Sequence, residues 1–225
     1  MNLPKLDDRL QKAADLYPDC EMGADIGSDH GRLPLHLIAM GRCKKMIVSD
    51  ISAPSLQKAK TLFALHGCSD QAIFRQASGL FALKETVQAV SIMGMGGDTL
   101  CGILSEAPQR LSGAALILSP HTDLDKVRGC LPPLGYRITA EKLARAGGRY
   151  YVVLKALPGD ILYTEKELLL GPCLIREHPT GFDDYLHWRS RVTLTALNAM
   201  EKAGDNPSRT DPLRRMLQYI KEELP

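Results

Sequence analysis

Residues 24–31 read Ala24-Asp25-Ile26-Gly27-Ser28-Asp29-His30-Gly31 and lie between a short apolar run and the segment Leu33-Pro34-Leu35-His36-Leu37-Ile38. That segment has the spacing of a helix, and its proline is tolerated only in a first helical turn. The stretch therefore predicts a strand, a tight turn and a helix.

Gly27 and Gly31 let the backbone of this turn approach a ligand, and the helix N-terminus offers unpaired N–H groups and a positive dipole end. We expect a nucleotide-like ligand here. The spacing is not the G-x-G-x-x-G dinucleotide fingerprint, and Asp25 and Asp29 would repel a pyrophosphate. An acidic residue at the strand end suits the ammonium group of S-adenosylmethionine better. The alternative is a glycine-bearing turn that binds no cofactor.

The composition indicates a soluble globular protein. Of the 225 residues, 44% are hydrophobic and 24% are charged, which is ordinary for a domain with a substantial core. The N-terminus lacks a basic-then-apolar signal segment, and no apolar run approaches the roughly 18 residues that a membrane span needs. We therefore expect a cytoplasmic protein with no membrane segment.

The six cysteines indicate neither a disulfide framework nor a metal site. They are Cys20, Cys43, Cys68, Cys101, Cys130 and Cys173, with no C-x-x-C pair and no histidines at zinc-finger spacing. We expect free, buried thiols and no metal.

The net charge of +2 divides into +4 over residues 1–157 and −2 over residues 158–225. No polybasic tail is present. Any contact with nucleic acid must therefore come from a local basic patch.

Apolar runs and turn residues predict five alternations of strand and helix, followed by an antiparallel strand pair. An amphipathic helix over 3–16, ending at Tyr17-Pro18, precedes the first strand. Further strands are expected at 46–48, 72–75, 89–93, 114–118, 136–139 and 150–154, and helices at 33–41, 52–62, 99–104 and 123–131. This pattern predicts a Rossmann-like α/β fold, with a mostly parallel sheet, helices on both faces and ligands beyond the carboxyl ends of the strands.

The composition changes near Pro158-Gly159, which predicts a domain over 1–157 and a second over 158–225. The second contains a short helix over 165–170, a loop punctuated by Gly171-Pro172 and His178-Pro179, and a long helix over 182–203. Gly204-Asp205-Asn206-Pro207 breaks this helix, and apolar residues then recur at steps of four, three and four from Leu213. The tail is therefore expected to be an antiparallel helical hairpin.

Two further segments suggest a nucleotide-type site. Asp50 lies 23 residues beyond Gly27, at the expected end of the second strand, where a carboxylate can accept hydrogen bonds from both ribose hydroxyls of an adenosine cofactor. As a lone Asp-x-Ser it would be a helix cap, which is an equally reasonable interpretation. Gly94-Met95-Gly96-Gly97 follows an apolar strand directly, and its three glycines imply a close approach of the backbone to a bound group.

With these positions in place, the chain resembles the TrmK family of bacterial tRNA methyltransferases over nearly its whole length. The resemblance rests on the 24–30 run followed by Leu33-Pro34, on Ser49-Asp50-Ile51, on Gly94-Met95-Gly96-Gly97, on Leu116-Ile117-Leu118 and on Gly171-Pro172. Leu6, Arg9 and Leu10 also look like the opening helix of the family. The resemblance implies methylation of N1 of the adenine at tRNA position 22, with S-adenosylmethionine as donor. It also implies a C-terminal helical hairpin that helps to hold tRNA.

The chain departs from the family pattern at three places. Ala77-Ser78-Gly79-Leu80 replaces Gly-Asp-Gly-Leu, so an aspartate that usually contacts the cofactor adenine is missing and Ser78 could bind it only more weakly. Ser119-Pro120-His121 stands where Gln-Pro-Asn is usual, and Gly31-Arg32 where Ala-Tyr is usual.

Under this resemblance, the candidate residues divide into three groups. The expected cofactor-binding residues are Asp25, Gly27, Ser28, Asp29, Gly31, Asp50, Ile51, Ala77, Ser78, Met93 and Gly94. The expected catalytic residues are Asp29, His30, Gly94 and Met95, with Asp29 stabilising the cationic product or orienting the base; capping of the following helix is the alternative role for Asp29. The expected RNA contacts are Arg9, Arg32, Lys126, Arg189, Arg191, Arg214 and Arg215, although arginines scattered along a helix usually form a solvated face.

The sequence leaves other functions open. An enzyme of the same fold could act on another RNA or on a small molecule, in which case the hairpin would be dispensable. Ser78 and His121 would instead favour a catalytically silent RNA-binding scaffold, which should bind no S-adenosylmethionine. A nicotinamide dehydrogenase is disfavoured because the third glycine is missing. In each case we expect a monomer.

Overall fold

The computed structural model describes residues 3–204 and 206–224. The chain divides into two compact units, Met1–Ile161 and Leu162–Pro225, and each is described by itself.

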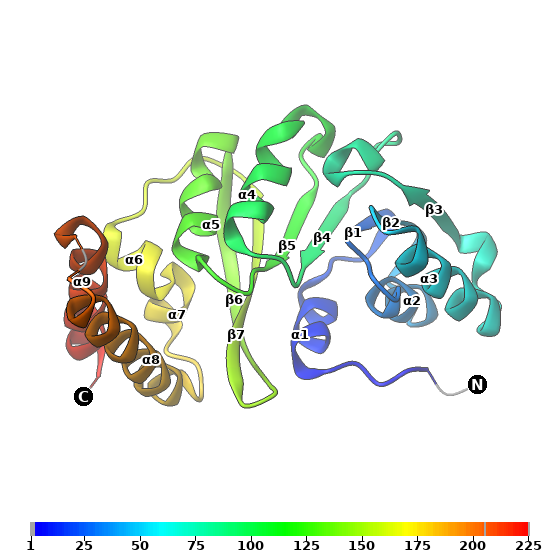
Figure 1. The fold of residues 1–225 in the computed structure, drawn as a ribbon. Coiled ribbons are helices and arrows are strands. Elements are labelled where there is room, and N and C mark those ends of the chain that lie inside the picture. The colour runs from blue at the N-terminus through cyan, green and yellow to red at the C-terminus, as the bar shows by residue number, and fades with distance from the viewer. Residues whose placement is uncertain (1–2, 205, 225) are drawn as a thin grey trace. The chain divides into compact units, whose positions relative to one another are not determined.

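The first unit is built on a seven-stranded sheet with the order β3-β2-β1-β4-β5-β7-β6 (Figure 1). The strands are β1 (Cys20–Ile26), β2 (Cys43–Asp50), β3 (Ala72–Gln76), β4 (Ala89–Met93), β5 (Ala115–Ser119), β6 (Tyr136–Ala146) and β7 (Arg149–Pro158). The first five run parallel, and β7 is antiparallel to both β5 and β6. The predicted Rossmann-like α/β fold is therefore confirmed.

Helices precede the first strand, fill three of the crossovers between parallel strands and follow the last parallel strand. In chain order they are α1 (Asp8–Leu16), α2 (Arg32–Ala39), α3 (Ala53–Leu65), α4 (Gly97–Glu106) and α5 (Leu124–Cys130). The chain moves outward from β1 to β3 and then returns to start β4 beside β1. Because such crossovers are right-handed, α2 and α3 cover one face of the sheet and α4 and α5 the other. The direction of winding reverses between β1 and β4, and ligands of open α/β sheets bind beyond the strand ends at such a point.

The central strands are buried on both faces, which explains their continuous apolar sequences. Every residue of β4 and of β5 is buried, as expected for a parallel sheet covered by helices on both faces. Tyr17 joins the N-terminal helix to this core, since its hydroxyl lies 3.1 Å from the carbonyl oxygen of Ala89 and 3.2 Å from that of Ala24.

The N-terminal helix begins later than predicted. Asp7 is its N-cap, and its Oδ1 accepts a hydrogen bond from the N–H of Leu10 at 2.8 Å. Leu3 and Leu6 therefore precede the helix, although Leu6 is still buried. Helix α1 packs against β5, β6 and β7, which brings its polar face toward the strand ends. The hairpin of β6 and β7 is also longer than the sequence predicted: the strands pair from Tyr136 and Pro158 to Ala146 and Arg149, and a register irregularity after Ile138 interrupts the period-two pattern by which a strand is recognised.

The second unit consists of four helices, α6 (Glu165–Leu170), α7 (Pro172–Glu177), α8 (Phe182–Lys202) and α9 (Pro207–Glu223), within its described residues. Helices α8 and α9 pack against each other, and α6 packs against α7 and α9. The prediction of a loop between Gly171 and His178 was wrong, because this segment forms helix α7. Pro172 occupies its first turn, where proline is favoured, and His178 ends it in a left-handed conformation. Of the predicted break after α8, Asp205 lies outside the described residues.

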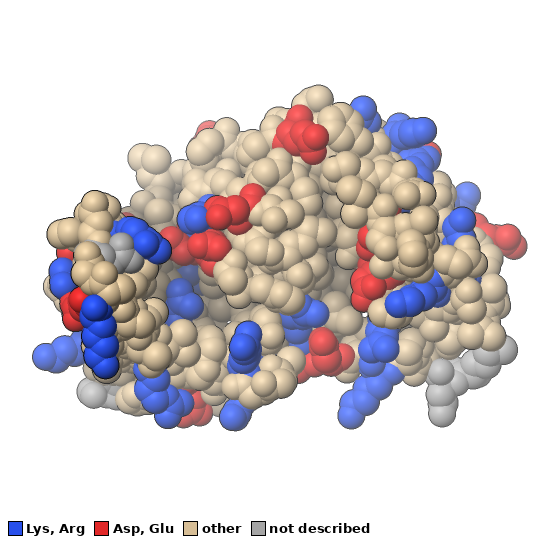
Figure 2. Space-filling model, in the orientation of Figure 1, with Lys and Arg blue, Asp and Glu red and all other residues tan. Residues whose placement is uncertain are grey.

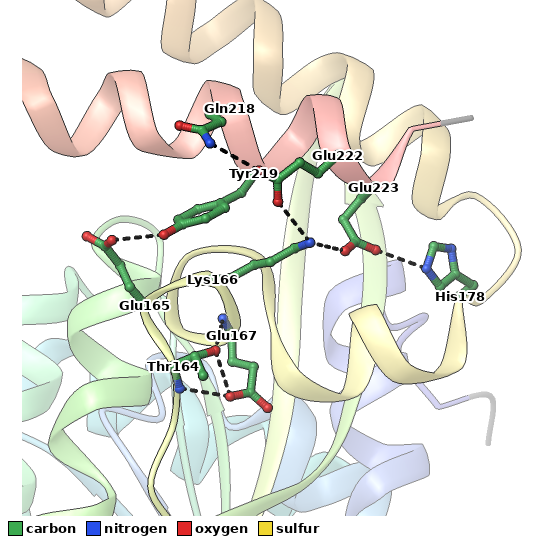
Figure 3. A network of polar contacts seen from close by, with 9 residues as sticks. All are labelled: Thr164, Glu165, Lys166, Glu167, His178, Gln218, Tyr219, Glu222 and Glu223. Carbon is green, nitrogen blue, oxygen red and sulfur yellow. Dashed lines mark hydrogen bonds and ion pairs between the residues drawn. The ribbon is translucent and has the colours of Figure 1, made fainter.

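Polar contacts hold α9 against α6 and α7 (Figure 3). Lys166 Nζ lies 2.6 Å from Glu223 Oε1 and 3.2 Å from Glu222 Oε2. The other carboxylate oxygen of Glu223 lies 3.1 Å from His178 Nε2. One lysine and one histidine from two short helices therefore meet the last turn of α9, where negative side chains would otherwise repel the dipole end of the helix.

The start of α6 is capped from within. Thr164 accepts a hydrogen bond from the N–H of Glu167, and the Glu167 carboxylate accepts one from the N–H of Thr164 at 2.8 Å (Figure 3). This reciprocal arrangement is a capping box.

Over the described residues, no helix combines the length and apolar character that crossing a bilayer requires.

Candidate active site

A cavity of about 750 Å³ opens at the carboxyl ends of β1, β2 and β4. Its size is in the usual range for small-molecule sites. The lining residues come from the ends of these strands, from the turns that follow β1, β2, β3 and β4, from α1, α2 and α4, and from the loop after β5. They are Asp7, Arg9, Leu10, Asp25, Ile26, Gly27, Ser28, Asp29, His30, Arg32, Leu33, Asp50, Ile51, Ala77, Ser78, Gly79, Met93, Gly94, Met95, Thr99, Ile103 and His121.

The turn after β1 has the backbone that its glycines permit. Gly27 and Gly31 have φ values of 71° and 69°, a region that favours glycine. Asp29 shares this left-handed region with φ of 48°, which aspartate and asparagine tolerate better than most residues. The turn is tied to β2, because the N–H of Ser28 donates to the carbonyl of Ser49 at 2.9 Å. A backbone hydrogen bond therefore fixes this end of the cavity to the end of β2.

Asp25 is a buried carboxylate at the base of the cavity. Its two oxygens accept hydrogen bonds from the hydroxyls of Ser28 and Ser91, each at 2.5 Å. Burial raises the pKa of Asp25 to about 6, with a smaller contribution in the same direction from nearby Asp50, while the two serine hydrogen bonds oppose the shift. A cationic ligand group in this cavity would therefore stabilise the charged form of Asp25.

Asp50 is buried at the end of β2. Its carboxylate fixes the adjoining turns by hydrogen bonds and also lines the cavity. Its Oδ2 accepts the N–H of Asp29 at 2.9 Å, and its Oδ1 accepts the N–H of Ser52 at 2.8 Å. Each oxygen of a carboxylate can accept a further hydrogen bond. Helix α3 is capped by Ser52, whose hydroxyl accepts the N–H of Ser55, so helix capping is not the task of Asp50.

Asp29 and His30 form a pair at the cavity wall. His30 Nδ1 donates to Asp29 Oδ2 at 2.5 Å, and the Asp29 carboxylate remains largely exposed. Asp29 does not cap α2: the N-cap is Gly31, without any side-chain hydrogen bond. The structure thus removes the capping alternative and leaves the carboxylate at the cavity.

The segment after β4 closes one side of the cavity. The N–H of Gly94 donates to the carbonyl of Ser119 at 3.0 Å, and the N–H of His121 donates to the carbonyl of Met95 at 2.7 Å. The Met95 side chain covers Gly27, since a Cβ built on Gly27 would lie 2.0 Å from the Met95 methyl carbon. The loops after β4 and β5 are therefore bound to each other and reach the turn after β1.

A cluster of Arg9, His121 and Tyr151 lies beside Gly94. Arg9 Nη1 donates to His121 Nε2 at 2.5 Å, and the Arg9 guanidinium lies over the Tyr151 ring at 5.5 Å from its centroid. The His121 and Tyr151 rings are 5.6 Å apart. Burial lowers the pKa of His121, and the charges of Arg9 and Arg149 lower it further.

The cavity brings together the residues that the sequence selected, with one exception. All four expected catalytic residues and all expected cofactor contacts other than Gly31 line it. A Cβ on Gly31 would lie 2.9 Å from the Ala59 Cβ and 3.2 Å from the Phe63 ring of α3. Gly31 therefore faces away from the cavity and allows α3 to pack against the turn.

The arginines and lysine expected to contact RNA differ in their surroundings. Arg9 and Arg32 line the cavity. Lys126 does not, and its ammonium group lies 2.8 Å from Asp98 and 3.3 Å from Asp123. Figure 2 shows lysine and arginine side chains on the visible face in separate small groups with acidic side chains between them.

The four expected arginines of the second unit also differ from one another. Arg214 is bound to Glu201 and Asp211, and Arg215 to Glu165. Among the described residues, Arg191 is exposed and has no ion pair, while Arg189 is half-buried with an unpaired Nε.

The sequence analysis missed several residues that line the cavity or support its lining. Ser91 gives a weak signal, as the one hydroxyl within an apolar strand, and its bond to Asp25 follows from the β1–β4 register that pairs these residues. Thr99 and Ile103 enter the cavity from α4, and their helical spacing gave no indication of this. His121 attracted notice only as a departure from the family pattern.

Comparison with known proteins agrees with this geometry. The pattern of a family described as "Methyltransferase domain" matches residues 6–154. The chain belongs to this methyltransferase family. The curated "tRNA (adenine(22)-N(1))-methyltransferase" of Bacillus subtilis is 28% identical over 100% of this chain and 99% of its own length. The predicted resemblance to the TrmK family is confirmed by this full-length similarity.

The similarity to solved structures extends over both units of the chain. A Streptococcus agalactiae protein of the NAD-binding Rossmann superfamily is 30% identical, with a TM-score of 0.89 over 99% of this chain and 98% of its own. The TrmK structure from B. subtilis is 27% identical, with a TM-score of 0.85 over 100% of both chains. A Streptococcus pneumoniae protein, solved in complex with S-adenosyl-L-methionine, is 28% identical with a TM-score of 0.87 over 98% of this chain and 100% of its own.

Proposed function

We propose that this methyltransferase transfers a methyl group from S-adenosylmethionine to N1 of an adenine in tRNA, at position 22. The observation that carries the proposal is the full-length similarity to the B. subtilis enzyme named for that reaction, together with a cavity whose acidic and glycine-bearing turns lie at the switch point of the sheet.

The cavity fits a cationic nucleoside cofactor. Asp25 is buried, has no basic partner among its hydrogen bonds and carries a raised pKa, so a ligand ammonium group would relieve an existing electrostatic cost. Asp50 retains acceptor capacity for ribose hydroxyls. Ile51, Ala77 and Ser78 lie on the adjoining wall and would contact the adenine. The S. pneumoniae relative was solved with this cofactor.

The bound cofactor would supply an electrophilic methyl group on a sulfonium. Adenine N1 already carries a lone pair, so the protein contributes chiefly by holding the base in line with that methyl group. N1 is masked in a base pair, and an unpaired or extruded adenine must therefore be captured, at a cost of a few kcal/mol.

The methylated base carries a positive charge. Asp29 would stabilise this charge as it develops, because its carboxylate is exposed at the cavity wall and is fixed by His30 Nδ1 at 2.5 Å. Gly94 and Met95 would line the pocket of the target base, and Met93 would lie below it.

We propose that the chain has a cofactor-binding domain over 1–157 and a second domain over 158–225. We assign the tRNA contacts outside the cavity to the helical hairpin of the second domain. Arg191 is the strongest candidate there, because its charge is not neutralised by a carboxylate among the described residues. Arg32 is the corresponding candidate at the cavity.

The test is incubation of the protein with unmodified bacterial tRNA and S-adenosylmethionine labelled in the methyl group, followed by mass spectrometry of the nucleosides. We expect labelled 1-methyladenosine, and loss of the label when adenine 22 is replaced by guanine. Methylation of a different nucleoside alone would overturn the proposal. A protein that binds no S-adenosylmethionine in equilibrium dialysis would be a silent scaffold.

A further inference from the structure

We propose that Arg9 is a preorganised clamp for the phosphate of the target nucleotide, and that His121 is the positioning residue that holds its guanidinium in place. This inference rests on the proposed function, since it concerns how an RNA strand is held at the same cavity. It adds a role for His121 and a chemical identity for the group that Arg9 binds.

The Arg9 guanidinium is fixed from two sides. One N–H donates to His121 Nε2 at 2.5 Å, and the planar group lies over the Tyr151 ring. Only 18% of the side chain is exposed, so most of its rotational freedom is already lost before RNA binds. A guanidinium has five N–H donors, and the remaining donors stay available for a ligand.

The charge of Arg9 is only partly offset by the acidic residues at the start of its helix, because its ion pair there, with Asp7, is long. Asp7 Oδ2 is 4.0 Å from Arg9 Nη2, and the other oxygen of Asp7 caps the helix through Leu10. Asp8 lies 3.8 Å from Lys12 and accepts the N–H of Arg145 at 2.7 Å. Both partners that hold Arg9 closely, an imidazole and a phenol ring, are neutral. An anion that approaches Arg9 would therefore meet a positive charge that a long ion pair with Asp7 offsets only in part.

The position of this charge fits the backbone of a nucleotide whose base enters the cavity. A Cβ on Gly94 would lie 3.3 Å from Arg9 Nη1 and 3.6 Å from His121 Nε2. The cluster is thus adjacent to the segment expected to line the target base, on the cavity side formed by α1. Planar guanidinium donors bind phosphate oxygens in pairs, and a phosphate carries the negative charge that attracts this cation, whereas a base edge is uncharged.

The hydrogen bond from Arg9 requires His121 to be neutral, because only neutral imidazole offers an acceptor nitrogen. The groups that face His121 are Arg9 from α1 and Arg149 and Tyr151 from β7. Both charged neighbours are cations and disfavour protonation of the ring. Once His121 is protonated at low pH, it must release Arg9 and repel it.

The first experiment compares Arg9→Lys and Arg9→Gln with the wild-type protein. We expect Arg9→Gln to raise the KM for tRNA about tenfold, and to reduce the slope of log KM against log salt by about 1, as for the loss of one phosphate contact. Arg9→Lys should keep the salt slope and raise KM less. The Kd for S-adenosylmethionine and the melting temperature serve as controls for folding.

The second experiment tests the positioning role with two variants at position 121. Asparagine offers a carbonyl acceptor that does not titrate, and leucine offers none. We expect His121→Leu to raise the KM for tRNA like Arg9→Gln, and His121→Asn to retain a low KM at pH 7.5. Because burial and two cations lower the pKa of His121, the KM of the wild-type protein relative to His121→Asn should stay constant near the ordinary histidine pKa of about 6.5 and rise at lower pH. Groups common to both proteins cancel in this ratio.

An unchanged salt slope in Arg9→Gln would overturn the phosphate assignment. A pH-independent KM ratio, or a normal KM for His121→Leu, would overturn the role of His121. If the wild-type protein binds S-adenosylmethionine but methylates no tRNA, it is the proposed function that fails; if it methylates tRNA and the variants behave as wild type, only this inference fails.

Discussion

The Ser91 hydroxyl donates a hydrogen bond to Asp25 Oδ1 at 2.5 Å, across the paired strands β4 and β1. Together with Ser28 on the other oxygen, Ser91 orients a buried carboxylate that lines the cavity. The hydrogen bonds from the two hydroxyl groups lower the pKa of Asp25, but burial raises it more, so that the pKa is about 6. The protein therefore maintains an electrostatically costly group at the place where a cationic ligand is proposed to bind.

We predict that Asp25→Asn stabilises the free protein and abolishes cofactor binding. A pKa raised from 3.8 to about 6 means that the charged form costs the folded state roughly 3 kcal/mol at most. We expect the free energy of unfolding at pH 7.5 to increase by roughly 1 to 3 kcal/mol, as measured by urea denaturation, and S-adenosylmethionine binding to disappear from calorimetric titrations.

The pH dependence of that stability difference provides the control. The penalty is fully present above the folded pKa of about 6, decreases as pH falls through it and vanishes below the unfolded value of 3.8. The advantage of Asp25→Asn should therefore be smaller at pH 5 than at pH 7.5. An advantage that grows toward low pH would contradict the assignment.

Asp29→Asn should lower kcat for tRNA methylation by about 10- to 100-fold, with a smaller effect on the KM for S-adenosylmethionine. The reason is the loss of a carboxylate beside the cation that forms on the base. Asparagine tolerates the left-handed φ of 48° at this position, so the variant separates charge from backbone strain. Single-turnover rates measure the effect, and an unchanged rate would restrict Asp29 to a structural role.

Cys20 should be the thiol that alkylating reagents modify first. Its pKa is lowered mainly by the hydrogen bond with Cys43, whose sulfur is 3.0 Å away, and to a lesser extent by Arg42. Because thiolate is the reactive form, iodoacetamide at pH 7.5 should label Cys20 faster than Cys68, which has similar partial exposure. Cys43→Ala should remove this difference. Peptide mass spectrometry at successive times gives both rates.

Arg191→Gln should weaken tRNA binding more than Arg214→Gln does. Arg191 is exposed without an ion pair in the described part of the chain, whereas Arg214 is held by Glu201 and Asp211, and a neutralised arginine attracts phosphate less. We expect about a threefold increase in Kd for Arg191→Gln at 0.1 M salt, by filter binding or fluorescence anisotropy. Equal effects of the two variants would show that the ion pairs of Arg214 open on binding.

The fold followed from the sequence because its local signals agreed with one another. The run from Ala24 to Gly31 predicted a strand, a turn and a helix; β1 ends at Ile26, before the turn, and α2 lies close to the predicted range of 33–41. Strand β4 and helix α6 have the predicted bounds. Helix α7 was missed because Gly171-Pro172 is a turn signal and also a good helix start, and only tertiary contacts distinguish the two.

The sequence predicted which residues lie at the candidate site where the ends of the strands determine their positions. It did not predict which side chains contact each other there. The positions of Asp25, Gly27 and Asp50 followed from strand ends, which meet at one edge of a parallel sheet. The contact between Arg9 and His121 joins residues 112 positions apart and depends on how α1 packs on β7. No local pattern encodes that packing, so the sequence could place each residue but not the pair.

Gly97 has a mechanical consequence for the site. A Cβ at this position would lie 2.6 Å from the carbonyl oxygen of Asp123 and 2.7 Å from that of Thr122, so the first turn of α4 rests directly on the backbone of the loop after β5. The backbone hydrogen bonds from Gly94 to Ser119 and from His121 to Met95 continue this contact. The two loops are therefore expected to shift together, so that a motion of the cavity wall at Met95 would also displace His121.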